Sequence, residues 1–280
     1  MRSLLIILFS VLLVVFQTAC QSNKYIENTY EMSPKSNWSD QHRKTAKKAY
    51  LYAQMSNNSY GQAGDEYDND GNDFVLPSDW KAQHVGNDEL GFAYSIYRKT
   101  KDDKLQEVVI AFRGTEGITN FDDVYHGNLL ARQNPLAISL YKITRSRLDR
   151  EEQSGVPIVL TGHSLGGALA IHAAINVPGE VPYYVFNSSP RFNRLGSDQG
   201  GGDPDALMRK RHSIVETSEF LYALRFPATE ANQIYTPFNC DENFKPFTSH
   251  GIEKLAACLT LIASLNNSEA KVEMVKKKNR

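Results

Sequence analysis

The sequence predicts an α/β fold in which a mostly parallel central sheet carries helices on both faces. Strand-like and helix-like segments alternate along the chain, which is typical of that architecture. The clearest unit is an apolar run at 156–160, followed by a glycine-rich turn and an alanine-rich helix expected over 165–176. The chain has 280 residues, 41% of them apolar and 22% charged, so it can bury a sizeable core. No linker divides residues 40–280, and we expect them to form a single domain.

In the first half of this domain, alanines recur at helical spacing and predict a helix over 40–55. Residues 91–98 alternate apolar and polar side chains, and residues 105–112 form a second apolar run. A short polar turn joins these two runs, so together they predict a β-hairpin. An apolar stripe then predicts a helix over 135–152.

In the second half, residues 181–186 predict the next strand. Residues 191–211 are expected to be a long polar insertion with a glycine-rich centre and a basic end. A further strand and turn lie within 213–226, and a terminal helix is expected over 251–265. We expect the basic tail, residues 276–280, to be a solvated end.

The N-terminus has the features of an export signal. A positive residue precedes an apolar run at 4–16, which is too short to span a bilayer comfortably. Small residues then lead to Cys20, in a pattern that resembles a bacterial lipobox. Residues 1–20 are therefore expected to be a signal peptide with lipidation at Cys20, with ordinary cleavage nearby as the alternative. Residues 21–39 would be a tether, and Gln21 resembles signals for the outer membrane, with the protein facing the periplasm or the cell surface.

Composition argues against several classes of partner. The net charge is −1, so no strong positive field exists to attract nucleic acid. No Cys/His spacing resembles a zinc site. The acidic stretch within 57–73 places Gly71 at the glycine position of a calcium loop, but Pro77 then stands where a bidentate Glu is needed. We therefore expect a solvated loop there and no metal.

Two cysteines, Cys240 and Cys258, remain after the signal segment. An exported protein meets an oxidising compartment, so these cysteines can form a disulfide. Their separation permits the pairing but does not require it, and the sequence leaves the question open.

The turn after the apolar run at 156–160 fits the G-x-S-x-G pattern, with Ser164 at its centre. A strand before this pattern and a helix after it are the context of a nucleophile elbow, which projects the serine hydroxyl above the sheet. Gly162 and Gly166 lack Cβ atoms, so the strand and the helix can approach closely. His163 is next to the serine, but its position in the turn points it away, and we expect it to be structural.

Three motifs resemble the class 3 lipase family, the fungal-type triacylglycerol lipases and their bacterial relatives. These motifs are VIAFRGT at 109–115, TGHSLGG at 161–167 and FNSSPR at 186–191. The similarity runs from about residue 44 to residue 265, and it departs from the family where Asn187 or Ser188 stands in place of glycine. The resemblance implies an α/β-hydrolase fold and a serine esterase that acts on a lipid ester, either acylglycerol or phospholipid, without a metal or organic cofactor.

A serine hydroxyl needs a base, and in this superfamily the base follows the serine in the chain. Three histidines do so. His172 lies two turns into the helix after the elbow, so its side chain cannot turn back. His212 lies beside a basic run, where positive neighbours would lower its pKa. His250 lies in a loop just before the terminal helix, where the family carries its base, and is therefore the predicted base.

The base needs an acid to orient it. Glu219 aligns with the family's acid, which is usually Asp, in a segment that ends a strand. The longer Glu side chain would need a slightly different backbone position. Glu216, Asp203 and Asp205 remain alternatives at this stage.

The predicted oxyanion hole has two donors. One is the backbone N–H of Leu165, at the start of the helix after the serine. The other is Thr115, which follows an Arg-Gly pair and matches the family's oxyanion residue.

We therefore expect a serine hydrolase with Ser164, His250 and Glu219 as its triad, acting on a lipid at a membrane surface to which its own anchor holds it. One alternative is a catalytically inactive lipid-binding envelope protein with the same pocket. Another is a serine hydrolase acting on a non-lipid ester. The basic stretch 209–212 would suit an anionic head group but is also typical of a solvated loop end.

Overall fold

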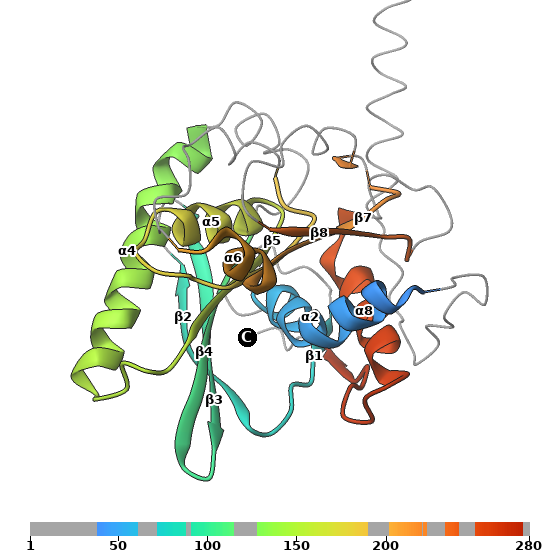
Figure 1. Cartoon of the computed structure of the whole chain (residues 1–280), viewed down its shortest axis with the longest axis horizontal. Helices are drawn as coiled ribbons and strands as arrows, with labels where there is room; N and C mark the ends of the chain where they lie inside the picture. The colour runs from blue at the N-terminus through green and yellow to red at the C-terminus, as the bar shows by residue number, and fades with distance from the viewer. Residues whose placement is uncertain are drawn as a thin grey trace, which may run out of the picture. The chain divides into compact units, whose positions relative to one another are not determined.

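The central feature of the fold is a seven-stranded mixed sheet, seen here in a computed structural model of the chain (Figure 1). The structure describes residues 38–60, 72–87, 91–114, 128–189, 202–219, 221–222, 233–240 and 250–276. They all belong to one unit, Glu31–Arg280. The expected signal and tether, Cys20, the acidic stretch at 61–71 and Thr115 lie outside the described residues, except for the last two positions of the tether.

The strand order in this sheet is β2-β3-β4-β5-β6-β7-β8. The strands are β2 (Trp80–Asn87), β3 (Ala93–Lys101), β4 (Lys104–Phe112), β5 (Ile158–His163), β6 (Tyr183–Phe186), β7 (Arg211–Glu216) and β8 (Ile234–Phe238). β2, β3 and β4 are antiparallel neighbours, whereas β4 to β8 are all parallel. The predicted hairpin is confirmed, and the parallel strands place the ends of β4, β5, β6 and β7 at one edge. A separate two-stranded sheet pairs β1 (Asn72–Phe74) with β9 (Met274–Lys276).

Helices cover both faces of the large sheet, as expected. They are α2 (Asp40–Asn58), α4 (Asn128–Arg150), α5 (Leu165–Ile175), α6 (Pro204–Lys210) and α8 (Ile252–Ser264). α2 and α8 lie side by side, and α2 packs on β5 (Figure 1). α4 and α5 pack together on the opposite face. The arrangement is an α/β-hydrolase fold.

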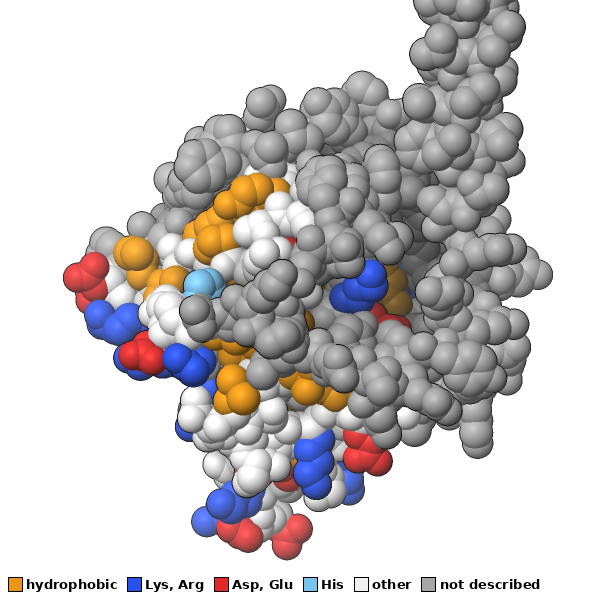
Figure 2. Space-filling model, turned by 90° about the vertical axis from the view of Figure 1, so that its right-hand side faces the viewer, with side chains coloured by type: hydrophobic (Ala, Val, Ile, Leu, Met, Phe, Trp, Pro, Cys, Tyr) orange, Lys and Arg blue, Asp and Glu red, His pale blue; other side chains and the backbone are white. Residues whose placement is uncertain are grey.

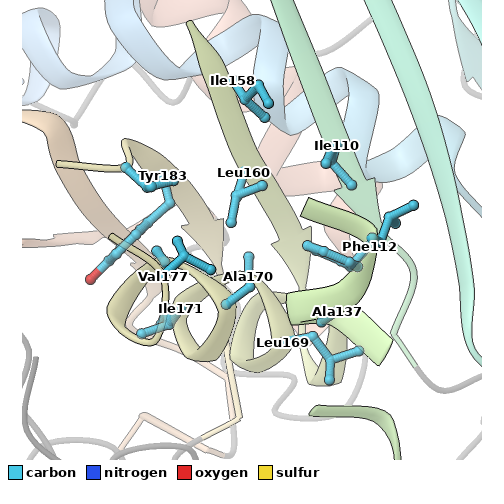
Figure 3. Packing of buried hydrophobic residues seen from close by; sticks show 14 of the residues in the cluster. Ile110, Phe112, Ala137, Ile158, Leu160, Leu169, Ala170, Ile171, Val177 and Tyr183 are labelled. Carbon is cyan, nitrogen blue, oxygen red and sulfur yellow. The ribbon is translucent and has the colours of Figure 1, made fainter. Parts of the chain in front are cut away.

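The alternation of side chains along β4 and β5 divides the core between the two faces. Ile110 and Leu160 pack with the residues of α4 and α5 (Figure 3). Val109 and Val159 point the other way and pack with Met55 of α2. Both faces of these strands are apolar because both are covered, as in parallel sheets generally.

The bounds of two expected elements differ from those predicted. The helix predicted over 135–152 begins at Asn128 and carries Pro135 inside it. Proline in a helix interior removes one N–H hydrogen bond, yet the helix continues on both sides of Pro135. The prediction of a polar insertion over 191–211 was wrong for its last residues, because residues 204–210 form the helix α6. Asp203 caps this helix and Pro204 is its first residue, a favoured pair at a helix start.

Four strands, β1, β2, β8 and β9, were not predicted from the sequence, and β1 begins inside the stretch that was expected to be a solvated loop. β8 contains Pro237, which argues against a central strand, but β8 is an edge strand and tolerates it. The tail was expected to be solvated, yet Met274–Lys276 pairs with β1. Such pairing of distant, short segments has no local signal.

The surface shows no strong segregation of charge on the face drawn in Figure 2. Acidic and basic side chains are interspersed at the margins of the described surface there, and hydrophobic side chains gather between them. Within the described ranges, none of the helices combines the length and the apolar character needed to cross a membrane.

Candidate active site

Ser164 occupies a tight bend between the end of β5 and the start of α5. Its backbone has φ 54° and ψ −123°, a conformation that costs a non-glycine residue about 1–3 kcal/mol. The surrounding backbone holds it there. Ser164 N donates to Phe186 O at 3.0 Å, and Ser164 O accepts from Ser189 N at 3.0 Å and from Ala168 N at 3.2 Å.

The two glycines of the motif allow the close approach that this bend needs. A Cβ atom on Gly162 would collide with the backbone of Gly166, and a Cβ atom on Gly166 would collide with the carbonyl group of Phe112. The predicted strand, turn and helix are therefore present, and the requirement for glycine at both positions is steric.

The structure brings Ser164, His250 and Glu219 together from three separate segments. His250 Nε2 lies 3.1 Å from Ser164 Oγ, and His250 Nδ1 lies 3.0 Å from Glu219 Oε2. The Glu219 side chain is fully buried and the His250 side chain is 15% exposed. Leu221 N also donates to Glu219 Oε2 at 2.9 Å. With the proton of the neutral ring on Nδ1, the serine hydroxyl donates to Nε2 and the ring donates to the carboxylate.

Glu216, an alternative acid, is also buried, but its carboxylate faces another loop. Its Oε2 accepts from Cys240 N at 2.8 Å. Its Oε1 accepts from Ser218 N at 3.2 Å and from Ser218 Oγ at 3.0 Å. These contacts give Glu216 the place of a structural carboxylate that ties the end of β7 to the end of β8.

The other two alternatives, Asp203 and Asp205, lie at the start of α6. Asp203 Oδ1 accepts from Asp205 N at 3.2 Å as the helix cap, and both residues are exposed. Of the four candidate acids, Glu219 is the one in contact with the His250 ring.

The two remaining candidate bases lie away from Ser164. His172 is buried in α5 and contacts Asn176, and burial lowers its pKa. His212 is stacked on Tyr184 with ring planes 7° apart. Its pKa is lowered to about 4, mainly by burial and secondarily by Lys48. The sequence analysis expected the direction of this shift but attributed it to neighbouring charges, whereas burial is the larger cause.

Of the two predicted oxyanion donors, the structure describes Leu165. It is the first residue of α5, so its N–H has no carbonyl partner within its own helix. Thr115 lies outside the described residues, but Gly114 just before it lies against the elbow, and a Cβ atom there would meet Ser164 Cβ at 3.2 Å. The chain that leads to position 115 therefore passes next to Ser164.

Sequence reasoning missed two polar residues beside the site, Tyr60 and Asn187. Tyr60 Oη lies 2.8 Å from His163 Nδ1, and Asn187 Nδ2 donates to His250 O at 3.1 Å. Asn187 has φ 42°. The sequence feature that could have indicated its importance is that it stands at a motif position where the resembling family usually has glycine. Tyr60 follows a helix and had no such feature.

Cys240 and Cys258 form a disulfide with a Cα–Cα distance of 6.0 Å. The bridge joins Cys240, two residues after β8, to α8, and the loop that it closes contains His250. The disulfide therefore restrains the segment that carries the candidate base.

The basic stretch at 209–212 divides into two exposed side chains, Arg209 and Lys210, which form surface ion pairs, and two buried ones, Arg211 and His212. Lys210 Nζ lies 2.6 Å from Glu180, and Arg209 lies 3.9 Å from Asp203. Arg211 is fully buried and donates to two backbone carbonyls. These contacts favour a structural role over recognition of a head group. In the part of the chain that the structure describes, no three His, Cys, Asp or Glu side chains gather as a metal site would require.

Solved structures similar to this chain include three fungal lipases. They are the lipase from Rhizopus microsporus var. chinensis (17% identity, 71% of this chain and 75% of that chain, TM-score 0.45), the nonglycosylated lipase from Yarrowia lipolytica (14%, 66% and 75%, TM-score 0.45) and lipase II from Rhizopus niveus (14%, 65% and 75%, TM-score 0.44). At these identities and TM-scores the likeness does not define an activity. No curated protein matches the chain by sequence.

A family model identifies the family of the chain. Residues 44–192 match the phospholipase-like family model described as the Tle-like phospholipase domain. The matched region contains the strand, the elbow with Ser164 and the helix that follows it. Because the match covers more than half of the chain, the protein belongs to the lipase-like family of Tle-like phospholipase domains.

Proposed function

We propose that this protein is a serine hydrolase that cleaves carboxylic esters of phospholipids or acylglycerols through an acyl-enzyme. The observation that carries the proposal is the hydrogen-bonded series Ser164 Oγ, His250 Nε2, His250 Nδ1 and Glu219 Oε2. A nucleophile, a base and an orienting acid in this order are the parts that acyl transfer requires.

In the proposed reaction, Ser164 Oγ attacks the ester carbonyl carbon while His250 Nε2 takes the hydroxyl proton. Glu219 stabilises the imidazolium that forms, and the N–H groups of Leu165 and Thr115 stabilise the oxyanion. His250 then gives its proton to the leaving alcohol. Water, activated by the same ring, releases the fatty acid and restores the serine. No metal or organic cofactor takes part.

The family description favours a phospholipid as the substrate. A serine nucleophile with a histidine base and an oxyanion hole at the start of a helix suits attack on an ester carbonyl, so we favour cleavage of the acyl ester over the phosphate ester. We therefore infer that the products are a free fatty acid and a lysophospholipid, and that the phosphate ester stays intact.

An inactive lipid-binding protein with the same pocket is the alternative from another functional class, and the unusual glutamate was its main support. Glu219 nevertheless lies within hydrogen-bond distance of the His250 ring, and its carboxylate is buried. This contact favours an active enzyme over an inactive one.

We also propose that lipidation at Cys20 anchors the mature protein, which would face the periplasm or the cell surface from the outer membrane. The lipobox-like sequence supports this, and an anchored enzyme would meet its lipid substrate at the interface. The test compares detergent-phase partitioning of the expressed full chain with that of Cys20→Ser. The wild type should enter the detergent phase and the variant should not; equal partitioning would contradict lipidation.

The activity is tested by incubating defined phosphatidylcholine and triacylglycerol dispersions with the wild type and with Ser164→Ala. Free fatty acid, lysophospholipid and phosphorylated head group are measured separately. We expect fatty acid and lysophospholipid from the wild type alone. Equal turnover by both proteins would exclude Ser164 as the nucleophile, and release of head group would exclude acyl-ester cleavage. A fluorophosphonate probe should label the wild type, whereas an inactive binding protein would remain unlabelled.

A further inference from the structure

The backbone carbonyl of His250 is held by two side chains from outside its own segment. His163 Nε2 lies 2.7 Å from His250 O, and Asn187 Nδ2 donates to the same oxygen at 3.1 Å. His163 ends β5 and Asn187 follows β6, so the donors come from neighbouring parallel strands. His163 is 6% exposed and Asn187 is fully buried. Two well-buried donors on one carbonyl use both of its lone pairs.

The proton positions around His163 follow from its partners. The carbonyl of His250 can only accept, so His163 Nε2 carries the proton. In the neutral ring Nδ1 is then an acceptor, and Tyr60 Oη, 2.8 Å away, donates to it. The Tyr60 oxygen in turn accepts from Gly114 N at 3.1 Å. The resulting hydrogen-bonded path runs from Gly114, which precedes the predicted oxyanion residue, to the backbone of the candidate base.

Asn187 makes a second connection. Its Oδ1 accepts from Glu216 N at 2.8 Å while its Nδ2 donates to His250 O. Glu216 ends β7, and the turn after it carries Glu219. A single amide therefore joins the segment that holds the candidate acid to the segment that holds the candidate base. The positive φ of 42° at Asn187 is one that asparagine tolerates better than most residues.

We propose that His163 and Asn187 are positioning residues that fix the His250 backbone, so that its ring reaches Ser164 and Glu219 at once. This inference rests on the proposed function. The His250 ring must keep two hydrogen bonds in opposite directions, at 3.1 Å and 3.0 Å. A small rotation of its backbone would lengthen at least one of them, and a displacement of about 1 Å at a reacting group costs about a hundredfold in rate.

Burial alone offers a simpler explanation, in which these side chains merely satisfy one another inside the protein. The two explanations predict different results. A structural role lowers the stability, and hence the amount of folded protein, but leaves the rate constant of each folded molecule unchanged. A positioning role lowers that rate constant in protein that remains folded, and it lowers kcat with little change in KM.

Three variants separate these roles. Asn187→Gly removes both hydrogen bonds of the amide, and glycine adopts a positive φ without strain. His163→Phe keeps an aromatic ring beside the His250 ring, whose centroid is 4.8 Å away, but has no donor. His163→Gln restores an N–H donor in the same direction. His172→Gln is the matched control, because His172 is a buried histidine that the site does not use.

The measurements are the rate of fluorophosphonate labelling per folded molecule, kcat and KM on a phospholipid dispersion, and the thermal unfolding curve. For Asn187→Gly and His163→Phe we expect labelling and kcat to fall by about tenfold or more at temperatures where both remain folded, with KM within about twofold. His163→Gln should recover most of the rate, and His172→Gln should match the wild type. Wild-type rates per folded molecule in Asn187→Gly and His163→Phe would overturn the proposal.

Failure of the proposed function gives a different result. In that case the wild type itself would remain unlabelled, or would be as active as Ser164→Ala. If the wild type is labelled at Ser164 while both positioning variants are labelled equally fast, the serine hydrolase stands and the positioning role is wrong.

Discussion

Glu219 Oε2 accepts hydrogen bonds from His250 Nδ1 at 3.0 Å and from Leu221 N at 2.9 Å. The second bond comes from the turn that carries the glutamate, so this turn holds the carboxylate independently of its contact with the histidine. In the proposed triad, this bond accounts for a glutamate at a position where the resembling family usually has the shorter aspartate. The glutamate side chain bends back toward the backbone of its own turn, where Oε2 accepts from Leu221 N. The bend accommodates the additional methylene group.

Replacing either of the two buried glutamates should separate catalysis from stability. Glu219→Gln should lower kcat by about 10²–10⁴-fold, because a neutral amide neither orients nor stabilises the imidazolium as a carboxylate does. Glu216→Gln should instead lower the free energy of unfolding by about 1–3 kcal/mol, because its new NH₂ group would face backbone donors. Steady-state kinetics and urea unfolding of both variants test this. A larger kcat loss in Glu216→Gln would reassign the acid.

The strained backbone of Ser164 predicts that glycine is better tolerated than alanine at this position. Ser164→Ala and Ser164→Gly should both lose fatty acid release by about 10⁴-fold or more. Only glycine relieves the strain at φ 54°. Glycine also has more conformational entropy in the unfolded chain, which offsets part of this gain. We therefore expect Ser164→Gly to be more stable than Ser164→Ala by about 1 kcal/mol. Calorimetric unfolding of the two variants measures the difference, and a less stable glycine variant would contradict the strain.

The pKa of His212 predicts a loss of stability in mild acid. Its ordinary value is about 6.5, and burial, together with Lys48, lowers it to about 4. Between these two pH values the unfolded chain binds a proton that the native protein does not, so the free energy of unfolding falls as the pH falls, by about 3 kcal/mol in full. His172 adds to the loss in the same direction, because burial also lowers its pKa.

His212→Phe is the matched test, since a phenyl ring can keep the stacking on Tyr184 but does not titrate. Urea unfolding between pH 4 and pH 7 should show a shallower pH dependence in this variant than in the wild type. Identical slopes would show that the pKa of His212 is the same in the native and unfolded protein, which would contradict the prediction.

The disulfide predicts a redox-dependent stability. The two cysteines are 18 residues apart, and opening a loop of that size costs about 3 kcal/mol in the chain-entropy account. The double variant Cys240→Ser, Cys258→Ser should be less stable by about that amount, and the wild type in reductant should behave like it. Urea unfolding with and without reductant checks both statements. The variant serves as the control, because reductant should leave it unchanged; equal stability of the oxidised wild type and the variant would contradict the prediction.

The parts of the site with contiguous sequence signals were predictable. The elbow is one strand, one turn and one helix in succession. Gly162 and Gly166 approach so closely that a Cβ atom on Gly162 would collide with the backbone of Gly166, which explains the two glycines of the motif. His250 could be selected because it lies where the resembling family carries its base, whereas His172 lies within the helix after the elbow and His212 lies beside a basic run at the start of a strand. The hairpin followed from two adjacent strand-like runs, and α5 followed from an apolar, alanine-rich run directly after the elbow.

The remaining errors have a common origin. α4 begins at Asn128 and continues through Pro135, although proline removes an intrahelical hydrogen bond, and β8 contains a proline that is tolerated because β8 lies at a sheet edge. Neither fact is visible until the neighbours of each segment are known.

By itself the sequence determined the α/β architecture, the nucleophile elbow and the family to which the chain belongs, because each is encoded in segments whose residues are close together in the chain. The tertiary structure alone decided which of four acids meets His250, that Cys240 pairs with Cys258, and that His163 and Asn187 hold one carbonyl oxygen. The contacts to His250 join it to residues 31 to 87 positions away that end or follow parallel strands, and the disulfide joins the segment after β8 to a helix. Their distances depend on how the sheet brings those ends together, and no local pattern records that.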